Sequence, residues 1–345
     1  MREDLRIRLT ELGASDADME RAEADGWLPL LALDRMLLPG RPKYDLGALA
    51  SAAALDEDVA RGLWRAIGFP DVPPGIEVFT DRDVDAVRLA LSQSGELDLA
   101  DGTLLQQVRV ISASLARIAS VEADGFAATL AGLQAENLSD DEIALEVLAD
   151  TRLAEVGVLI EYLHRVQLRA AVWRRLVLAA EPDLAIAVGF ADLAGYTELS
   201  AGLDAAALSA LIARWEAIAY DTIAAQGARV VKTIGDEVMF VGLPAQVVDA
   251  ATALRDAAVD AGLPLLRIGA ASGAVVARDG DFFGPAVNLA NRLTEVARLG
   301  EMLGPAALYE ELRAAGGGGL RWVRRGDREL RSIGTVEVFA VEPSG

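Results

Sequence analysis

The sequence predicts an α+β protein in which an all-α N-terminal domain precedes a C-terminal domain built on a helix-covered, mostly antiparallel sheet. From Met1 to about Asp150 the chain reads as short amphipathic helices separated by Pro/Gly turns. At Glu181-Pro182-Asp183 the pattern changes, because proline disfavours a continuing helix and the run Leu184–Ala191 is wholly apolar, as in a buried strand. We therefore predict an all-α domain at residues 1–150, a helical linker at 151–180 and a second domain at 181–345.

Apolar spacing justifies the elements of the first two segments. In the first domain we expect helices at Asp58–Ile67 and Leu104–Ile118, with turns at Pro39-Gly40 and Pro73-Pro74-Gly75. The linker contains no proline, and its apolar residues recur at helical intervals, so we expect one uninterrupted helix there. This helix is expected to connect the domains and to pair with its copy.

Helical and strand-like patterns alternate through the second domain. In order, we expect a strand at 184–191, a helix at 204–225, a hairpin at 228–241, a helix at 245–261, a strand at 265–276, a helix at 284–297 and strands at 320–324 and 336–341. This order is typical of a sheet of the split βαβ kind with helices covering it.

Composition restricts the possible functions. With no cysteine and one histidine among 345 residues, thiolate and imidazole-rich metal sites are excluded, so a metal must sit on carboxylates, as Mg²⁺ or Mn²⁺ does. A formal net charge of −21 repels polyanions, which makes nucleic acid a poor partner. No run approaches the roughly 20 apolar residues of a membrane span, and no signal peptide is recognisable. We therefore expect a cytoplasmic protein.

Two aspartates are the candidate metal ligands. Asp192 follows the apolar run at the expected end of a strand, where a helix N-cap is the alternative interpretation. Asp236 and Lys232 flank Ile234-Gly235 at the hairpin tip, and a local ion pair contributing under about 1 kcal/mol is the alternative there. If both acids reach one sheet edge, their repulsion is relieved by two divalent ions about 3.5–4 Å apart, which could also activate a hydroxyl and stabilise a transferred phosphorus.

Asn288 and Arg292 are the candidate transition-state residues. They are four positions apart on an expected helix and so share one face, where both could point to one substrate. The planar fork of arginine matches phosphate oxygens. Taken singly, Asn288 is better explained as a polar residue at a helix start and Arg292 as a solvated helix residue.

Three motifs together resemble the class III nucleotidyl cyclases. They are Phe190-Ala191-Asp192-Leu193-Ala194-Gly195-Tyr196-Thr197, Lys232-Thr233-Ile234-Gly235-Asp236, and the stretch from Asp281 to Arg292 that reads Asp-x-x-Gly-x-x-Val-Asn-x-Ala-x-Arg. They occur in the family's order, and the resemblance covers about Pro182 to Val341. It implies the ferredoxin-like βαββαβ catalytic fold.

The resemblance also implies roles for individual residues. Asp192 and Asp236 would bind two Mg²⁺ or Mn²⁺ ions with the backbone carbonyl of Leu193. Lys232 and Asp281 would read the adenine edge of ATP, and Asn288 and Arg292 would stabilise the transition state. Arg331 stands where the family often has a lysine that meets the terminal phosphates, although the following glycine is Ser332 here. Asn291 replaces the small residue common before the transition-state arginine.

The implied reaction is attack of the ribose 3′-hydroxyl on the α-phosphorus, which gives 3′,5′-cyclic AMP and pyrophosphate. In this family each site takes its metal acids and its transition-state residues from different subunits, so a homodimer is expected. An ammonium donates to a ring nitrogen of adenine and a carboxylate accepts from its amine, so Lys232 and Asp281 favour ATP over GTP. A guanylate cyclase, or a catalytically silent nucleotide-binding regulator, is the alternative.

The first domain resembles the N-terminal regulatory domain of autoinhibited, acid-activated bacterial adenylate cyclases. The resemblance rests on Leu33–Leu38, Pro39-Gly40, Tyr44–Leu55, Leu63–Phe69 and Phe79–Leu89. It implies an inhibitory dimerisation module whose connecting helix rearranges on acidification. His164, the only histidine, is a candidate pH sensor on that helix, and relief of repulsion among the 53 acids is an alternative.

Two other interpretations of the first domain are open. Tyr44–Ala50 also looks like the start of a helix-turn-helix, although the acidic charge argues against DNA. The abundance of apolar residues could mark a lipid-binding pocket.

Overall fold

The computed structural model describes residues 1–94, 103–180, 185–316 and 320–342. The chain divides into two compact units, Met1–Leu168 and Arg169–Gly345. The division falls inside the helix α9 (Arg152–Ala180), which covers nearly all of the segment predicted as a linker. The predicted change at Glu181-Pro182-Asp183 lies outside the described residues. The predicted boundaries at 150 and 180 remain predictions.

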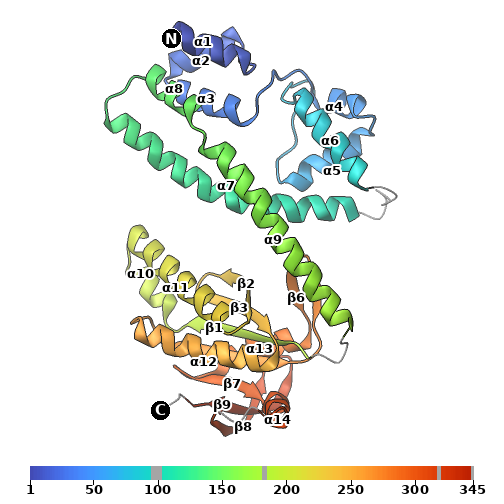
Figure 1. Cartoon of the computed structure of the whole chain (residues 1–345), viewed down its shortest axis with the longest axis vertical. Helices are drawn as coiled ribbons and strands as arrows, with labels where there is room; N and C mark the ends of the chain where they lie inside the picture. Colours follow the sequence, from blue (N-terminus) through green and yellow to red (C-terminus); the bar gives the residue numbers. More distant parts are fainter. Residues whose placement is uncertain (95–102, 181–184, 317–319, 343–345) are drawn as a thin grey trace. The chain divides into compact units, whose positions relative to one another are not determined.

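The first unit is helical, which confirms the predicted class of this region (Figure 1). Before α9 its helices are α1 (Glu3–Glu11), α2 (Asp16–Asp25), α3 (Leu28–Leu37), α4 (Leu46–Ala52), α5 (Glu57–Ile67), α6 (Asp81–Ser94), α7 (Thr103–Ala135) and α8 (Asp140–Ala149). One apolar cluster joins α1, α2, α3 and α8, and a second joins α4, α5 and α6 around the buried ring of Phe79. The predicted helix Leu104–Ile118 is too short, because α7 continues through Gly125 and Gly132 to Ala135.

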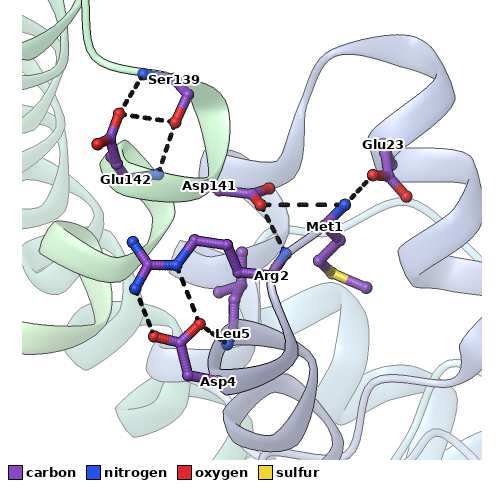
Figure 2. A network of polar contacts seen from close by, with 8 residues as sticks. All are labelled: Met1, Arg2, Asp4, Leu5, Glu23, Ser139, Asp141 and Glu142. Atoms are coloured by element: carbon purple, nitrogen blue, oxygen red, sulfur yellow. Dashed lines mark hydrogen bonds and ion pairs between the residues drawn. The ribbon is translucent and has the colours of Figure 1, made fainter.

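Polar contacts connect the start of the chain to two later helices (Figure 2). The amino group of Met1 pairs with Glu23 of α2, and the backbone N–H of Arg2 donates to Asp141 of α8 at 2.6 Å. Ser139 and Glu142 form a capping box that satisfies backbone donors at the start of α8. These contacts position α1 against the helices that share its apolar cluster.

A cavity of about 250 Å³ lies between α7 and α8. Apolar side chains of both helices line it, and Glu146, Asp150 and Arg152 add charged groups. This cavity lies in the unit for which the sequence suggested a lipid-binding pocket.

The second unit contains a seven-stranded sheet with the order β2-β3-β1-β4-β7-β9-β8 and a small hairpin, β5-β6 (Figure 1). The strands are β1 (Ala187–Leu193), β2 (Arg229–Ile234), β3 (Glu237–Gly242), β4 (Leu266–Ser272), β5 (Val276–Arg278), β6 (Asp281–Phe283), β7 (Met302–Pro305), β8 (Trp322–Leu330) and β9 (Gly334–Val341). The helices are α10 (Tyr196–Ala201), α11 (Ala205–Ala225), α12 (Pro244–Asp260), α13 (Pro285–Val296) and α14 (Ala306–Ala314). The segment β1-α11-β2-β3-α12-β4 forms the predicted βαββαβ unit, so the fold class is confirmed.

Helices cover both faces of this sheet. On one face, Trp215 of α11 and Leu254 of α12 are fully buried against odd-numbered residues of β1 such as Ala191. On the other face, even-numbered residues of β1 such as Phe190 pack with Ala290 of α13. The two faces follow from the alternation of side chains along a strand.

Gly269 of β4 allows α13 to approach the sheet closely. A Cβ atom there would lie 2.2 Å from the carbonyl oxygen of Ala290 and 2.4 Å from the backbone nitrogen of Thr294. Glycine is therefore required at this point by the backbone of the helix, and α13 lies directly over β1 and β4.

The structure corrects two predicted strands. The predicted strand 265–276 ends at Ser272, because Gly273 adopts a φ of 144°, and the chain then forms the β5-β6 hairpin. The predicted strand 184–191 instead continues to Leu193, so Asp192 is a strand residue and not a helix N-cap; Gly195 caps α10. No helix among the described residues is both long and apolar enough to cross a membrane.

Candidate active site

Asp192 and Asp236 meet at one end of the sheet. Asp192 is the last residue of β1 that pairs with β3, and Asp236 lies beside it in the two-residue turn between β2 and β3, after Gly235 with a φ of 62°. The pKa of Asp192 is raised to about 6, first by burial and then by the hydrogen bond to Asp236 and the negative charge of Asp236. The two carboxyl groups that the sequence singled out are therefore direct neighbours.

The backbone carbonyl of Leu193 points toward the same end of the sheet as the two aspartates. The N–H of Ala194 donates to Leu265 on the β4 side at 3.0 Å. The carbonyl of Leu193 belongs to the same trans peptide group as this N–H and points in the opposite direction, toward β3 and the turn that holds Asp236. This orientation suits the role predicted for that carbonyl.

The Asp192 carboxylate belongs to a row of charged residues across three strands. Glu237 of β3 and Arg267 of β4 are its direct partners in the two ladders, so all three side chains lie on the α13 face of the sheet. The pKa of Glu237 is raised to about 7, first by burial and then by the charges of Asp192 and Asp236. Arg267 lowers the pKa of Asp192, in opposition to these effects.

Sequence reasoning did not identify Glu237 and Arg267 as site residues. The available signal was their position: each is a charged residue at the end of an apolar strand, in register with an acid already chosen. That register became visible only with the strand order.

Lys232 is brought to Asp281, which lies 49 residues later on β6. Their partly buried side chains form an ion pair. A β-bulge between Val230 and Lys232 places Lys232 opposite Met239, a residue of the α13 face. The local pair between Lys232 and Asp236, considered from the sequence, is replaced by this long-range pair.

Asn288 and Arg292 lie on α13, as predicted. Asn288 is exposed, and Arg292 pairs with Glu295 on the next turn of the same helix. Between them, the amide of Asn291 donates to the Glu237 carboxylate at 3.2 Å. Within one chain the structure therefore brings Asn291, rather than Asn288 or Arg292, to the acid-bearing strands.

Arg331 is exposed in the turn between β8 and β9. The sheet order places this hairpin at the edge opposite to β2 and Lys232. Ser332, which follows it, adopts a φ of 64°, a conformation that glycine reaches without strain. The turn thus keeps the backbone of a glycine turn with a serine in its place.

His164 is exposed on α9, in the first unit. Neighbouring exposed residues of this helix include Leu163 and Tyr162, so the imidazole lies beside an apolar surface of the helix. The structure leaves the predicted role of His164 in pH sensing untested.

The oxygen-rich donor set at the end of β1 fits a hard divalent cation. Two carboxylates in contact repel each other when both are ionised, and Mg²⁺ or Mn²⁺ between them would remove that repulsion. In the described residues there is no cluster of three or more histidine, aspartate or glutamate side chains arranged to hold a metal. The fit therefore rests on the aspartate pair with backbone oxygen.

These features define a nucleotidyl cyclase type of domain, and comparisons with known proteins agree. Residues 178–343 match the family described as adenylate and guanylate cyclase catalytic domain. The chain is 32% identical to an adenylate cyclase of Streptomyces coelicolor, over 82% of this chain and 75% of that protein. It is 31% identical to the pH-sensitive adenylate cyclase MT1302 of Mycobacterium tuberculosis, over 96% of this chain and 90% of that protein.

Among solved structures, the adenylyl cyclase CyaB from P. aeruginosa is 24% identical, covers 47% of this chain and 95% of its own, and has a TM-score of 0.40. The chain belongs to the adenylate and guanylate cyclase family. The predicted resemblance to class III adenylate cyclases is thereby confirmed. The roles of the individual site residues remain predictions.

Proposed function

We propose that this adenylate cyclase converts ATP to 3′,5′-cyclic AMP and pyrophosphate at two equivalent sites of a homodimer. The observation that carries the proposal is the meeting of Asp192 and Asp236 at one end of the sheet. The names of two relatives, adenylate cyclases of Streptomyces and Mycobacterium, support ATP as the substrate.

The aspartate pair would hold two Mg²⁺ or Mn²⁺ ions with the Leu193 carbonyl. When bound, such ions lower the pKa of an attacking hydroxyl and stabilise charge on the phosphorus. The contribution of the chain is to hold two carboxylates in contact in a half-buried place, where their repulsion favours cation binding. The two carboxylates must be ionised to bind the cations in this way.

The Lys232–Asp281 pair is proposed to select the purine. An ammonium donor and a carboxylate acceptor side by side match the ring nitrogen and the exocyclic amine of adenine. Their mutual ion pair keeps both groups oriented before the nucleotide binds. Guanine presents the opposite polarity on the same edge and would leave both groups unsatisfied.

Asn288 and Arg292 are proposed to act in the site whose metals the partner subunit holds. Asn288 is exposed, and Arg292 is held by a half-exposed Glu295 that phosphate oxygens could replace. Arg331, exposed in its turn at the other edge of the sheet, is proposed to meet the terminal phosphates.

The N-terminal unit is proposed to regulate the catalytic unit, with pH as the signal. A relative that covers 96% of this chain is named a pH-sensitive adenylate cyclase, which supports this assignment. His164 on α9 is the proposed sensor. A lipid ligand, for which the cavity between α7 and α8 is the candidate place, is a further proposal about this unit.

The test is to incubate purified protein with Mn²⁺ and either ATP or GTP and to identify the products. We expect cyclic AMP from ATP, and no turnover for Asp192→Ala or Arg292→Ala. Mixing these two variants should restore about a quarter of the wild-type activity, because about half of randomly mixed dimers are heterodimers with one complete site. Glu310→Gln, an exposed acid of α14, is the control for loss of one charge.

Each alternative has its own result in this test. Preferred cyclisation of GTP would identify a guanylate cyclase, and nucleotide binding without product would identify a silent regulator. Normal turnover in Asp192→Ala would refute the metal assignment. For regulation, we expect acid to activate the wild type and His164→Ala to flatten the profile; a flat wild-type profile would reject control by pH.

A further inference from the structure

Asn291 of α13 and Glu237 of β3 form a contact that the reaction outlined above does not use. The amide nitrogen of Asn291 donates to a carboxylate oxygen of Glu237 at 3.2 Å, across 54 residues of sequence. Both side chains are partly buried. The contact joins the helix that carries the proposed transition-state residues to the strand that begins next to Asp236.

Glu237 stands among negative charges. It follows Asp236 directly in the chain, it is the ladder partner of Asp192, and Glu295 of α13 adds a third repulsive charge. A half-buried carboxylate in such surroundings needs hydrogen-bond donors to keep a fixed orientation. The amide of Asn291 is such a donor, and a smaller side chain at position 291 would not reach Glu237.

Asn291 occupies a position from which it can set the placement of α13. It directly precedes Arg292 and lies three residues after Asn288. The close approach at Gly269 fixes the distance between α13 and the sheet, but apolar contacts tolerate some rotation and sliding of the helix. The directional contact between Asn291 and Glu237 restricts that freedom next to the aspartate pair.

We propose that Glu237 and Asn291 are a positioning pair that holds α13 in register with the end of the sheet that carries Asp192 and Asp236. The inference rests on the proposed function. Because α13 would serve the site whose metals belong to the partner subunit, the pair links the metal half of one site to the transition-state half of the other. It acts through its neighbours and touches no reacting atom.

The first experiment compares variants that remove the contact with variants that keep it. Asn291→Ala and Glu237→Ala remove it, and we expect kcat to fall about tenfold or more with less than about a twofold change in KM for ATP. Glu237→Gln retains an acceptor oxygen for the amide and should keep most of the activity. If thermal unfolding shows that Asn291→Ala is not folded, Asn291→Ser takes its place in the comparison, because serine also cannot reach Glu237.

A matched control lies at the opposite edge of the same sheet. There the hydroxyl of Thr335 donates to Glu329 at 2.7 Å, another contact between a neutral donor and a glutamate. Thr335→Ala should leave kcat unchanged. The double variant Asn291→Ala/Glu237→Ala should be no worse than the more damaged single variant, because the two residues act through one contact.

Binding of Mn²⁺, measured by calorimetry without nucleotide, gives a readout that does not require turnover. Loss of a side chain that orients groups around metal ligands weakens metal binding by about tenfold or more in known sites. We expect Asn291→Ala to weaken Mn²⁺ binding at least threefold, or about 0.6 kcal/mol, relative to the wild type and Thr335→Ala.

Mixed dimers separate the two halves. When one chain carries Arg292→Ala and its partner Asp192→Ala, only one site is complete, and Asn291→Ala can be added to either chain. When Asn291→Ala is on the chain that supplies Arg292, we expect a lower kcat. When it is on the chain that supplies the aspartates, we expect that a higher concentration of Mn²⁺ is required for activity.

The results decide the two ideas separately. Unchanged kcat and unchanged Mn²⁺ affinity in Asn291→Ala would overturn the positioning pair, while an active wild type would leave the proposed function standing. A wild type that binds Mn²⁺ but yields no cyclic AMP would refute the proposed function, and the Mn²⁺ affinity of the variant would still decide the pair.

Discussion

Replacing Asp236 with asparagine should stabilise the metal-free protein and abolish its response to Mn²⁺. In the wild type the carboxylates of Asp192 and Asp236 touch at the end of the sheet, with Glu237 beside them. Asparagine keeps the size of the side chain and a hydrogen-bonding amide but removes one negative charge. The repulsion is relieved, and a ligand for the cations is lost.

The size of the effect follows from the raised pKa of Asp192. The change from 3.8 to about 6 would correspond to about 3 kcal/mol if Asp192 were fully buried. Asp192 is only half-buried, so solvent screens the interaction, and the contribution of burial itself remains in the variant. About 1 kcal/mol is left for the Asp236 charge, which raises the melting temperature of a domain of this size by about 2–4 °C.

The assay is thermal unfolding in EDTA and in Mn²⁺, at pH 5 and pH 8. At pH 8 Asp192, whose pKa is about 6, is ionised, so the stabilisation by Asp236→Asn should be greatest there. At pH 5 Asp192 is protonated in the folded state and the difference should nearly vanish. Glu310→Gln removes an exposed charge from α14 and should leave the melting temperature unchanged at both pH values.

Two results would refute this reasoning. A lower melting temperature for Asp236→Asn in EDTA at pH 8 would mean that the contact between the carboxylates does not destabilise the metal-free protein. An undiminished rise in melting temperature on adding Mn²⁺ would mean that Asp236 is not a metal ligand.

Three further predictions use other parts of the domain. Exchanging the charges in Lys232→Glu/Asp281→Lys should raise the ratio of kcat/KM for GTP to that for ATP at least about tenfold, because the polarity of the pair is reversed; an unchanged ratio argues against purine selection. Gly269→Ala forces a methyl group against the backbone of α13 and should destabilise the protein by about 2 kcal/mol, measured by urea unfolding, and reduce kcat; wild-type stability would contradict the close approach. In EDTA the free energy of unfolding should fall as pH rises from about 4 to 8, because the raised pKa values of Asp192 and Glu237 mean that the folded state binds these protons more tightly; a rise over that range would contradict it.

Local patterns in the sequence predicted the catalytic fold well. Each apolar run and each helical repeat of the βαββαβ unit is found within a few residues of its expected position, and the tip at Gly235-Asp236 is a two-residue turn. These elements have clear signals because each buries one face and ends at turn residues.

Long-range features were less accessible. The parallel pairing of β7 with β4 and the separation of β5 from β4 depend on contacts between distant segments. The apolar run through Gly273 gave no local sign of the break. Likewise, the sequence alone gave Lys232 a nearby acid, Asp236, as a possible partner, and only the folded hairpins bring Asp281 within reach.

The contact between Asn291 and Glu237 is likewise a long-range feature of the site that local sequence patterns do not reveal. The sequence marked Asn291 only as an unusual neighbour of Arg292. Its partner depends on how α13 crosses the sheet, which in turn depends on the absence of a side chain at Gly269.

The bulge before Lys232 has an evolutionary consequence. Val230 and Val231 both precede the ammonium, and the additional residue shifts the parity of the strand, so that Lys232 lies opposite Met239 instead of Val238. Deleting Val231 would remove the bulge and give a regular ladder in which the lysine still lies opposite Met239. The loss of a single codon at this place is therefore absorbed by the bulge, and a one-residue gap here in a sequence alignment does not indicate a change in nucleotide preference.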